Sequence, residues 1–191
     1  MTKLHYSLII IFALLLHSCT QEKQQITQAT KDAALRYAQG SQKVLGDGLM
    51  QAINNHGLTY AITFCNDTAE ILTQSISNIL NVNMKRVSDK NRNTNNAATQ
   101  KELAYISNSK TLLLNGKTIE PEYSISGNIV TTFVPIMTKP ICLSCHGNSV
   151  NMSPEVRTKI EGLYPEDKAL NYKDKELRGI WVVELQNLVS E

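Results

Sequence analysis

Two observations predict an α+β fold for this chain. In the first part of the sequence, apolar residues recur at helical spacing over residues 28–56, 58–76 and 97–114. From Lys117 onward the pattern changes to short runs of β-branched and aromatic residues separated by turn dipeptides. Helices that precede strands in this way are typical of α+β domains.

The long helical region divides at a predicted break. The first helix spans residues 28–56, and Gly46 and Gly48 interrupt its apolar stripe, so a kink and two separate helices both remain open. His56-Gly57 is expected to end it. The second helix carries Cys65 on its apolar face, so we expect this thiol to look inward.

The remaining elements follow from local signals. Residues 97–114 form another predicted helix closed by Asn115-Gly116, although this dipeptide is also a hairpin signal and strands beside it remain an alternative. A short helix is expected over residues 154–161, between Ser153 as N-cap and Gly162 as stop. Strands are expected in the other apolar runs: 84–87, 118–119, 123–125, 129–135 and 178–185.

The first residues have the features of an export signal. Lys3 is the only charged residue before the apolar run 8–16, which is too short to span a membrane. The following Ser18-Cys19 resembles the bacterial lipoprotein cleavage box, in which Cys19 is lipidated, although His17 departs from the residues usual there. An ordinary signal peptide that is cleaved nearby is the alternative.

We therefore divide the chain into a lipoprotein signal peptide (residues 1–18), a polar tether (residues 19–30) and one domain (residues 31–191). The protein is expected in the periplasm, held by its lipid at a bacterial membrane, and the inner and outer membranes both remain open. The formal net charge of +2 gives no reason to expect nucleic acid as a partner.

Residues 140–147 read Pro-Ile-Cys-Leu-Ser-Cys-His-Gly and contain a Cys-x-x-Cys-His motif. This is the attachment signature of c-type haem, because the thiols of Cys142 and Cys145 can each add across one vinyl group of one macrocycle. His146 then follows in place to bind the iron. A thioredoxin-like pair would need a βαβ pattern and a zinc knuckle a second pair of ligands, and neither is apparent. The sequence predicts one covalently attached haem c.

The second axial ligand of the iron has several candidates. The chain has four cysteines, and Cys19 and the motif pair account for three of them, so Cys65 has no disulfide partner left. A free cysteine can ligate iron, but it can also pack in a core as a small apolar residue. The other candidates are His56, expected as a solvated helix cap, and methionines that more often fill cores: Met50, Met84, Met137 and Met152.

Basic residues near the motif are candidates for binding the haem propionates. Arg86, Arg92 and Lys139 could make charge-assisted hydrogen bonds to them. Each is explained equally well as a solvated surface charge. Glu166-Asp167-Lys168 follows Pro165 and is most simply an exposed turn.

Ordered blocks of the sequence carry a family likeness: Ala61–Cys65, Lys85–Ser88, Asn91–Asn93, Pro135-Ile136, Cys142–Gly147, Leu163–Ala169 and Arg178-Gly179. With these blocks, from about Leu49 to Leu185, the chain resembles a bacterial family of c-type haem domains with a PAS-like fold. Several blocks at compatible spacings are more specific than the haem motif alone. The family often has proline after the Arg-Asn pair, where this chain has Thr94.

The resemblance has implications for fold and ligands. It implies a small antiparallel sheet flanked by helices, with a long N-terminal helix. It also implies an unusual axial pair, the histidine of the motif and a cysteine on an early helix, at positions that match His146 and Cys65. A thiolate ligand would favour ferric iron and a low reduction potential. Release of Cys65 on reduction would open a coordination position.

Two functions of different classes fit these features. The first is a redox or diatomic-gas sensor that passes its signal to a partner protein, since no output segment follows Leu185 in this sequence. Some members of the resembling family place the domain before signalling modules. The second is a small periplasmic electron-transfer cytochrome. Peroxidase-like catalysis would need a distal acid–base pair that does not stand out, so we expect no enzymatic activity.

Overall fold

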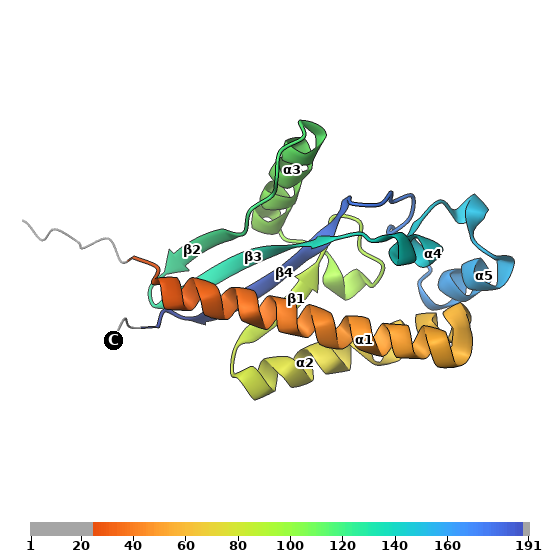
Figure 1. Cartoon of the computed structure of the whole chain (residues 1–191), viewed down its shortest axis with the longest axis horizontal. Coiled ribbons are helices and arrows are strands. Elements are labelled where there is room, and N and C mark those ends of the chain that lie inside the picture. Colours follow the sequence, from red (N-terminus) through yellow and green to blue (C-terminus); the bar gives the residue numbers. More distant parts are fainter. Residues whose placement is uncertain (1–24, 189–191) are drawn as a thin grey trace, which may run out of the picture.

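The computed structural model describes residues 25–188, and its centre is a four-stranded antiparallel sheet in the order β1-β4-β3-β2. Helices cover both of its faces (Figure 1). The strands are β1 (Asn83–Val87), β2 (Glu122–Ser126), β3 (Ile129–Met137) and β4 (Leu177–Gln186). The helices are α1 (Gln28–Asp67), α2 (Ala69–Leu80), α3 (Gln100–Leu114), α4 (Leu143–His146) and α5 (Pro154–Leu163), with single 3₁₀ turns at Thr94–Asn96, Pro140–Cys142 and Ser149–Asn151.

Strand β4 joins the two halves of the core, because its side chains alternate between the faces of the sheet. Trp181 and Val183 pack with the alanine-rich side of α1, whereas Ile180 and Val182 pack with Ile106 of α3. All five side chains are at most 3% exposed, which explains why β4 reads as a continuous apolar run rather than an alternating one. The predicted α+β class with a small antiparallel sheet is confirmed.

Helix α1 runs along the sheet, and α2 returns beside it (Figure 1). The regular helical backbone breaks at Gly57, whose φ of 82° lies in the left-handed region that glycine tolerates. The prediction of an interruption at His56-Gly57 is therefore confirmed. The prediction of one helix over residues 58–76 is wrong, since α1 ends at Asp67 and α2 begins at Ala69.

Helix α1 begins at Gln28, where the first helix is predicted, although the predicted tether runs to residue 30. Thr27 caps α1 by accepting a hydrogen bond from the Thr30 amide at 3.2 Å, and Thr30 is fully buried. The Thr30 hydroxyl also accepts a bond from the Leu188 amide at 2.8 Å. The end of the predicted tether, up to residue 30, thus belongs to the domain, because α1 pairs there with the chain that leaves β4.

The turn signals are resolved by the tertiary structure. Asn115-Gly116 ends α3, with Gly116 at a φ of 70°, so the alternative of a hairpin there is excluded. The β-hairpin turn lies at Gly127-Asn128 instead, between β2 and β3. Residues 118–119 are not in a strand, and α5 continues past Gly162 to Leu163.

Within residues 25–188, no helix combines the length and the apolar character that crossing a membrane requires.

Glu102 ties α3 to the edge strand β1. One carboxylate oxygen accepts the Thr99 amide at 2.7 Å, and the other lies 2.8 Å from the Lys85 ammonium. Burial raises the pKa of this carboxyl, but the hydrogen bonds from Lys85 and Thr99 outweigh it, so the pKa lies below its ordinary value of 4.5. The ionised carboxylate therefore contributes to the stability of the folded state.

We expect Glu102→Ala to lower the free energy of unfolding at pH 7 by about 2 kcal/mol, since it removes a helix cap and leaves Lys85 without its partner. A carboxyl whose pKa falls on folding stabilises above its ordinary pKa, so the difference should shrink as the pH falls below 4.5. Urea unfolding at several pH values measures it. The control Asp47→Ala breaks an exposed ion pair with Lys43 and should cost less than about 0.5 kcal/mol. Equal losses in the two variants would refute the assignment.

Candidate functional site

The Cys-x-x-Cys-His motif lies after β3, where a 3₁₀ turn (Pro140–Cys142) leads directly into the single turn of α4. This agrees with the prediction of a loop that enters a short helical turn. Cys142 and Cys145 are both partly exposed and neither forms a disulfide. The amide of Lys139 lies 3.4 Å from the Cys142 sulfur and donates to it. Both thiols are therefore free and reachable from solvent.

Gly147 lets the chain close against α4. Its amide donates to the Leu143 carbonyl at 2.9 Å, and a β-carbon at this position would lie 2.5 Å from the same oxygen. Any other residue would push the chain away from the turn. Beyond Gly147, the carbonyls of Gly147 and His146 each accept an amide from the segment that precedes β4, namely Asn171 and Tyr172, at 2.9 Å.

The side chain of His146 has a defined tautomer. Its Nδ1 lies 2.8 Å from the carbonyl oxygen of Ala169, and because a carbonyl only accepts, Nδ1 carries the proton and donates. The Tyr172 ring meets the imidazole edge-on, at 6.3 Å between centroids. Burial, then the charges of Arg92 and Arg178, hold the pKa of His146 well below its ordinary 6.5. The ring is therefore neutral at pH 7 and keeps a free electron pair on Nε2, the atom that binds metals.

Asp167 corrects the expectation of an exposed turn at residues 166–168. Glu166 and Lys168 are exposed, but the carboxylate of Asp167 is only 6% exposed. It accepts from Nε of Arg92 at 3.1 Å, and Nη2 of Arg92 also donates to the carbonyl of Cys145. Sequence reasoning missed this pairing because the two residues are 75 positions apart. The block Leu163–Ala169 in the family likeness was the signal that pointed to it.

Cys65 lies near the motif but does not face the core. The prediction that its thiol looks inward is wrong, since the residue is exposed. On the same stretch of α1, Ile62 belongs to the buried cluster against which Cys145 packs, whereas Cys65 stays at the surface. Surrounding protein nevertheless raises the pKa of the Cys65 thiol, while Arg86 and Arg92 lower it. Cys65 in turn helps to raise the pKa of Cys145, so the structure brings the two thiols into one electrostatic neighbourhood.

Arg86 is the predicted propionate ligand with the most distinctive surroundings. Its guanidinium lies over the Trp181 ring, at 5.6 Å, and Nη2 donates to the Ala69 carbonyl at 3.4 Å. Its Nε is buried and has no hydrogen-bond partner among residues 25–188. Burial lowers the pKa of Arg86, while Glu70, Cys65 and Tyr164 raise it. A buried donor without a partner indicates a place where a ligand can accept a hydrogen bond.

The other two predicted propionate ligands differ from Arg86. Lys139 is exposed beside Cys142. Arg92 already uses its Nε and Nη2 on Asp167 and on backbone carbonyls. Only its remaining N–H groups are available to a ligand.

The alternative iron ligands lie in less suitable places. His56 contacts Tyr60 on the helix surface, with the rings tilted by 53° and their centroids 4.5 Å apart. Met50 is 39% exposed. Met84 is buried under α1, where its sulfur accepts a weak bond from Ser41 at 3.9 Å. Met152 is buried in the cluster that Cys145 contacts, which makes it the nearest rival of Cys65. Met137, at the end of β3, packs against the cluster on the α3 side of the sheet.

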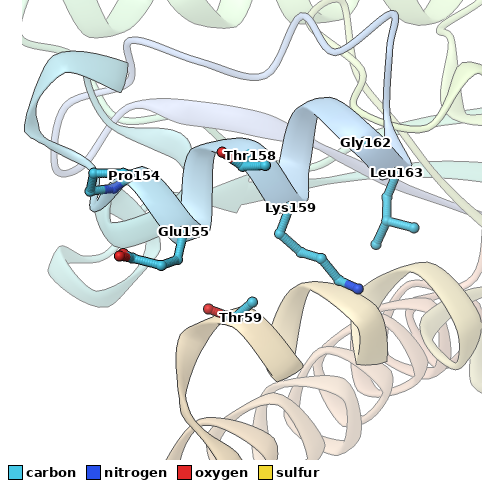
Figure 2. Close-up of a pocket in the computed structure, with 7 residues that line it drawn as sticks. All are labelled: Thr59, Pro154, Glu155, Thr158, Lys159, Gly162 and Leu163. Atoms are coloured by element: carbon cyan, nitrogen blue, oxygen red, sulfur yellow. The ribbon is translucent and has the colours of Figure 1, made fainter.

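A shallow groove between α1 and α5 lies apart from these side chains. Figure 2 shows Thr59 of α1 opposite Glu155 and Lys159 of α5. The remaining lining residues are Pro154, Thr158, Gly162 and Leu163, so no cysteine or histidine of the motif takes part. Within residues 25–188, no three His, Cys, Asp or Glu side chains gather in a metal-binding cluster. Cys19, the predicted lipid site, lies outside the described residues.

Comparisons with known proteins agree with this fold. The structure is similar to the crystal structure of the cyanobacterial heme-protein Tll0287, with a TM-score of 0.55 and 19% sequence identity. The alignment covers 80% of this chain and 96% of that one. No curated protein sequence matches this chain. The family model for Tll0287-like proteins matches residues 15–185. Because this match spans most of the chain, the protein belongs to the Tll0287-like family.

Proposed function

We propose that this protein carries one haem c, attached by thioether bonds to Cys142 and Cys145, with His146 as an axial ligand of the iron. The observation that carries this proposal is the hydrogen bond from His146 Nδ1 to Ala169, which leaves a neutral imidazole with Nε2 as its basic atom. The two thiols beside it are free and partly exposed. The haem-protein relative Tll0287 supports the same class of cofactor.

Cys65 is proposed as the opposite axial ligand. Its thiol is accessible and lies in the same electrostatic neighbourhood as Cys145. The surrounding protein raises the pKa of this thiol, and the charges of Arg86 and Arg92 act against that rise, in the direction that favours the thiolate. Met152, the nearest rival, is buried among apolar side chains and fills the core there. We also propose that Arg86 and Lys139 bind the haem propionates, since Arg86 offers a buried Nε that has no partner within residues 25–188.

The proposed role is that of a redox or diatomic-gas sensor rather than an enzyme. Haem would supply an iron centre that changes oxidation state and binds small ligands. The chain contributes the sulfur of Cys65, which lies on an exposed helix turn. This ligand can leave the iron without opening the core. A change at Cys65 would be passed to a partner protein through α1, the element that covers the sheet.

An electron-transfer cytochrome is the second candidate function. It is favoured by the partial exposure of Cys142 and Cys145, because a cofactor bonded to both would have an edge near solvent. Carbon monoxide separates the two functions. A sensor whose Cys65 leaves the reduced iron binds the gas, whereas a carrier with two permanent ligands does not.

We further propose that the protein is exported, lipidated on Cys19 and held at a membrane facing the periplasm. The support is in the sequence alone, from the apolar run 8–16 followed by Ser18-Cys19. Haem attachment of the c type takes place outside the cytoplasm, so both proposals place the chain in the same compartment.

The first prediction concerns covalent attachment. When the chain is made with a periplasmic haem-maturation system, its band should keep haem stain on a denaturing gel, because thioether bonds survive denaturation. The double variant Cys142→Ala/Cys145→Ala should lose the stain completely. Cys65→Ser is the matched control and should keep it, since Cys65 makes no thioether bond in this proposal. Stain retained by the double variant would rule out attachment at the motif.

The second prediction concerns the axial ligand. The oxidised protein should give low-spin optical and electron-paramagnetic spectra of thiolate type, and Cys65→Ser should lose them. Removal of the anionic ligand should raise the reduction potential, because ferric iron loses the partner that stabilises it. Met152→Leu serves as control and should leave the spectra unchanged. The assignment fails if Cys65→Ser leaves the ferric spectrum as it was, and a changed spectrum in Met152→Leu would favour the methionine.

The third prediction concerns the anchor. Cells grown with a clickable fatty-acid analogue should label the wild-type chain, and Cys19→Ala should remain unlabelled. Cys65→Ser controls for acylation of an exposed thiol and should be labelled like the wild type. Equal labelling of the wild type and Cys19→Ala would exclude lipidation at this residue.

A further inference from the structure

The ion pair between Arg92 and Asp167 is buried, and a buried ion pair by itself adds little to the free energy of folding. The two side chains are only 10% and 6% exposed, and Nη2 lies 3.0 Å from Oδ2. Taking two charges out of water costs free energy that their mutual attraction repays only when further hydrogen bonds satisfy both groups. The role of this pair therefore depends on the other groups that its atoms contact.

The further side-chain hydrogen bonds of the pair lead to the surroundings of His146, and the Arg92 guanidinium also lies over the Tyr164 ring, 5.8 Å from its centroid. The second carboxylate oxygen of Asp167 accepts the amide of Ala169 at 2.8 Å. The guanidinium of Arg92 donates through Nη2 to the carbonyl of Cys145 and, at 3.4 Å, to the carbonyl of Ala169. That same Ala169 carbonyl accepts Nδ1–H of His146 at 2.8 Å. Ala169 is fully buried, so water cannot replace these partners.

The remaining hydrogen bonds of this segment hold the backbone of the motif, and the Tyr172 ring meets the imidazole edge-on. The amides of Asn171 and Tyr172 donate to the carbonyls of Gly147 and His146, and these bonds fix where the chain runs. They do not determine in which direction the Ala169 carbonyl points. Besides His146 itself, Asp167 at the amide of Ala169 and Arg92 at its carbonyl are the side chains that hydrogen-bond the two peptide groups flanking this residue, among residues 25–188.

We propose that the Arg92–Asp167 pair is a positioning device that holds the Ala169 carbonyl against His146, and thereby sets the tautomer and the orientation of the imidazole. The contacts are made by this chain's own residues, so they can orient the ring without a bond at Nε2. Only the consequence for haem rests on the function proposed above. With haem attached, a strong bond from Nδ1–H to Ala169 makes the imidazole a better electron donor and favours ferric iron.

The first experiment uses the full chain expressed without haem maturation and labelled with ¹⁵N-histidine. Long-range proton–nitrogen spectra report the tautomer of each imidazole, and the His146 signals are assigned by their loss in His146→Gln. We expect the Nδ1–H form in the wild type. In Asp167→Asn and Arg92→Lys, the ratio of the Nδ1–H to the Nε2–H form should fall roughly fivefold, the loss expected for one neutral hydrogen bond.

Asp47→Asn is the matched control, because it removes a carboxylate from an ion pair that is exposed and remote from the motif in sequence. It should leave the tautomer ratio unchanged. Circular dichroism establishes that each variant is folded. A folded Asp167→Asn and a folded Arg92→Lys that both keep the wild-type ratio would overturn the proposal. Loss of folding in both variants would also overturn it, since the pair would then serve stability rather than the ring.

The second experiment measures the reduction potential of the haem-loaded protein. Arg92→Lys keeps the positive charge near the site but loses the planar set of donors. A potential above that of the wild type would therefore report a weaker His146–Ala169 bond and not a change of charge. An unchanged potential would refute the extension to the iron. If the chain takes up no haem while the tautomer still responds to the variants, the proposed function fails and the positioning role stands.

Discussion

The hydrogen bond between His146 Nδ1 and the Ala169 carbonyl is the constraint on which the site depends. His146 lies on α4, which has a single turn of four residues and cannot hold its own conformation in isolation. Its geometry comes from the segment that precedes β4. That segment is fixed by the amide of Tyr172 at one point and by contacts of Thr138 with Lys173 and Glu176 at another. The buried sheet therefore orients the histidine through a loop that contains no regular structure.

The charge of Arg92 acts on the protonation of both proposed iron ligands, His146 and Cys65. Burial and then the charge of Arg92 lower the pKa of His146, which keeps the imidazole neutral. The same charge lowers the pKa of the Cys65 thiol, although the surrounding protein raises that pKa more. A neutral imidazole and an ionised thiolate are the forms that bind a metal. Gly57 contributes the geometry, because the break in α1 sends its last turns towards α5 and the cluster around Ile62 and Cys145.

Much of the fold follows from local pattern. The capped helix α5, the strand β4 and the interruption at Gly57 were all predictable, because each has a signal within a few residues: Ser153 as N-cap, a continuous apolar run, and a glycine after an apolar stripe. The exposure of Cys65 was not predictable in this way. Its neighbours at helical spacing are apolar, but at this end of α1 it is Ile62 that enters the buried cluster, and Cys65 remains exposed.

The sequence by itself determined the Cys-x-x-Cys-His motif and the α+β class, since spacing and composition are properties of the chain alone. Only the tertiary structure decided that Asp167 is buried against Arg92, and that His146 donates to Ala169. The physical reason is that ion pairs and hydrogen bonds between distant segments depend on distances of about 3 Å, and no local pattern encodes such distances across 23 or 75 residues.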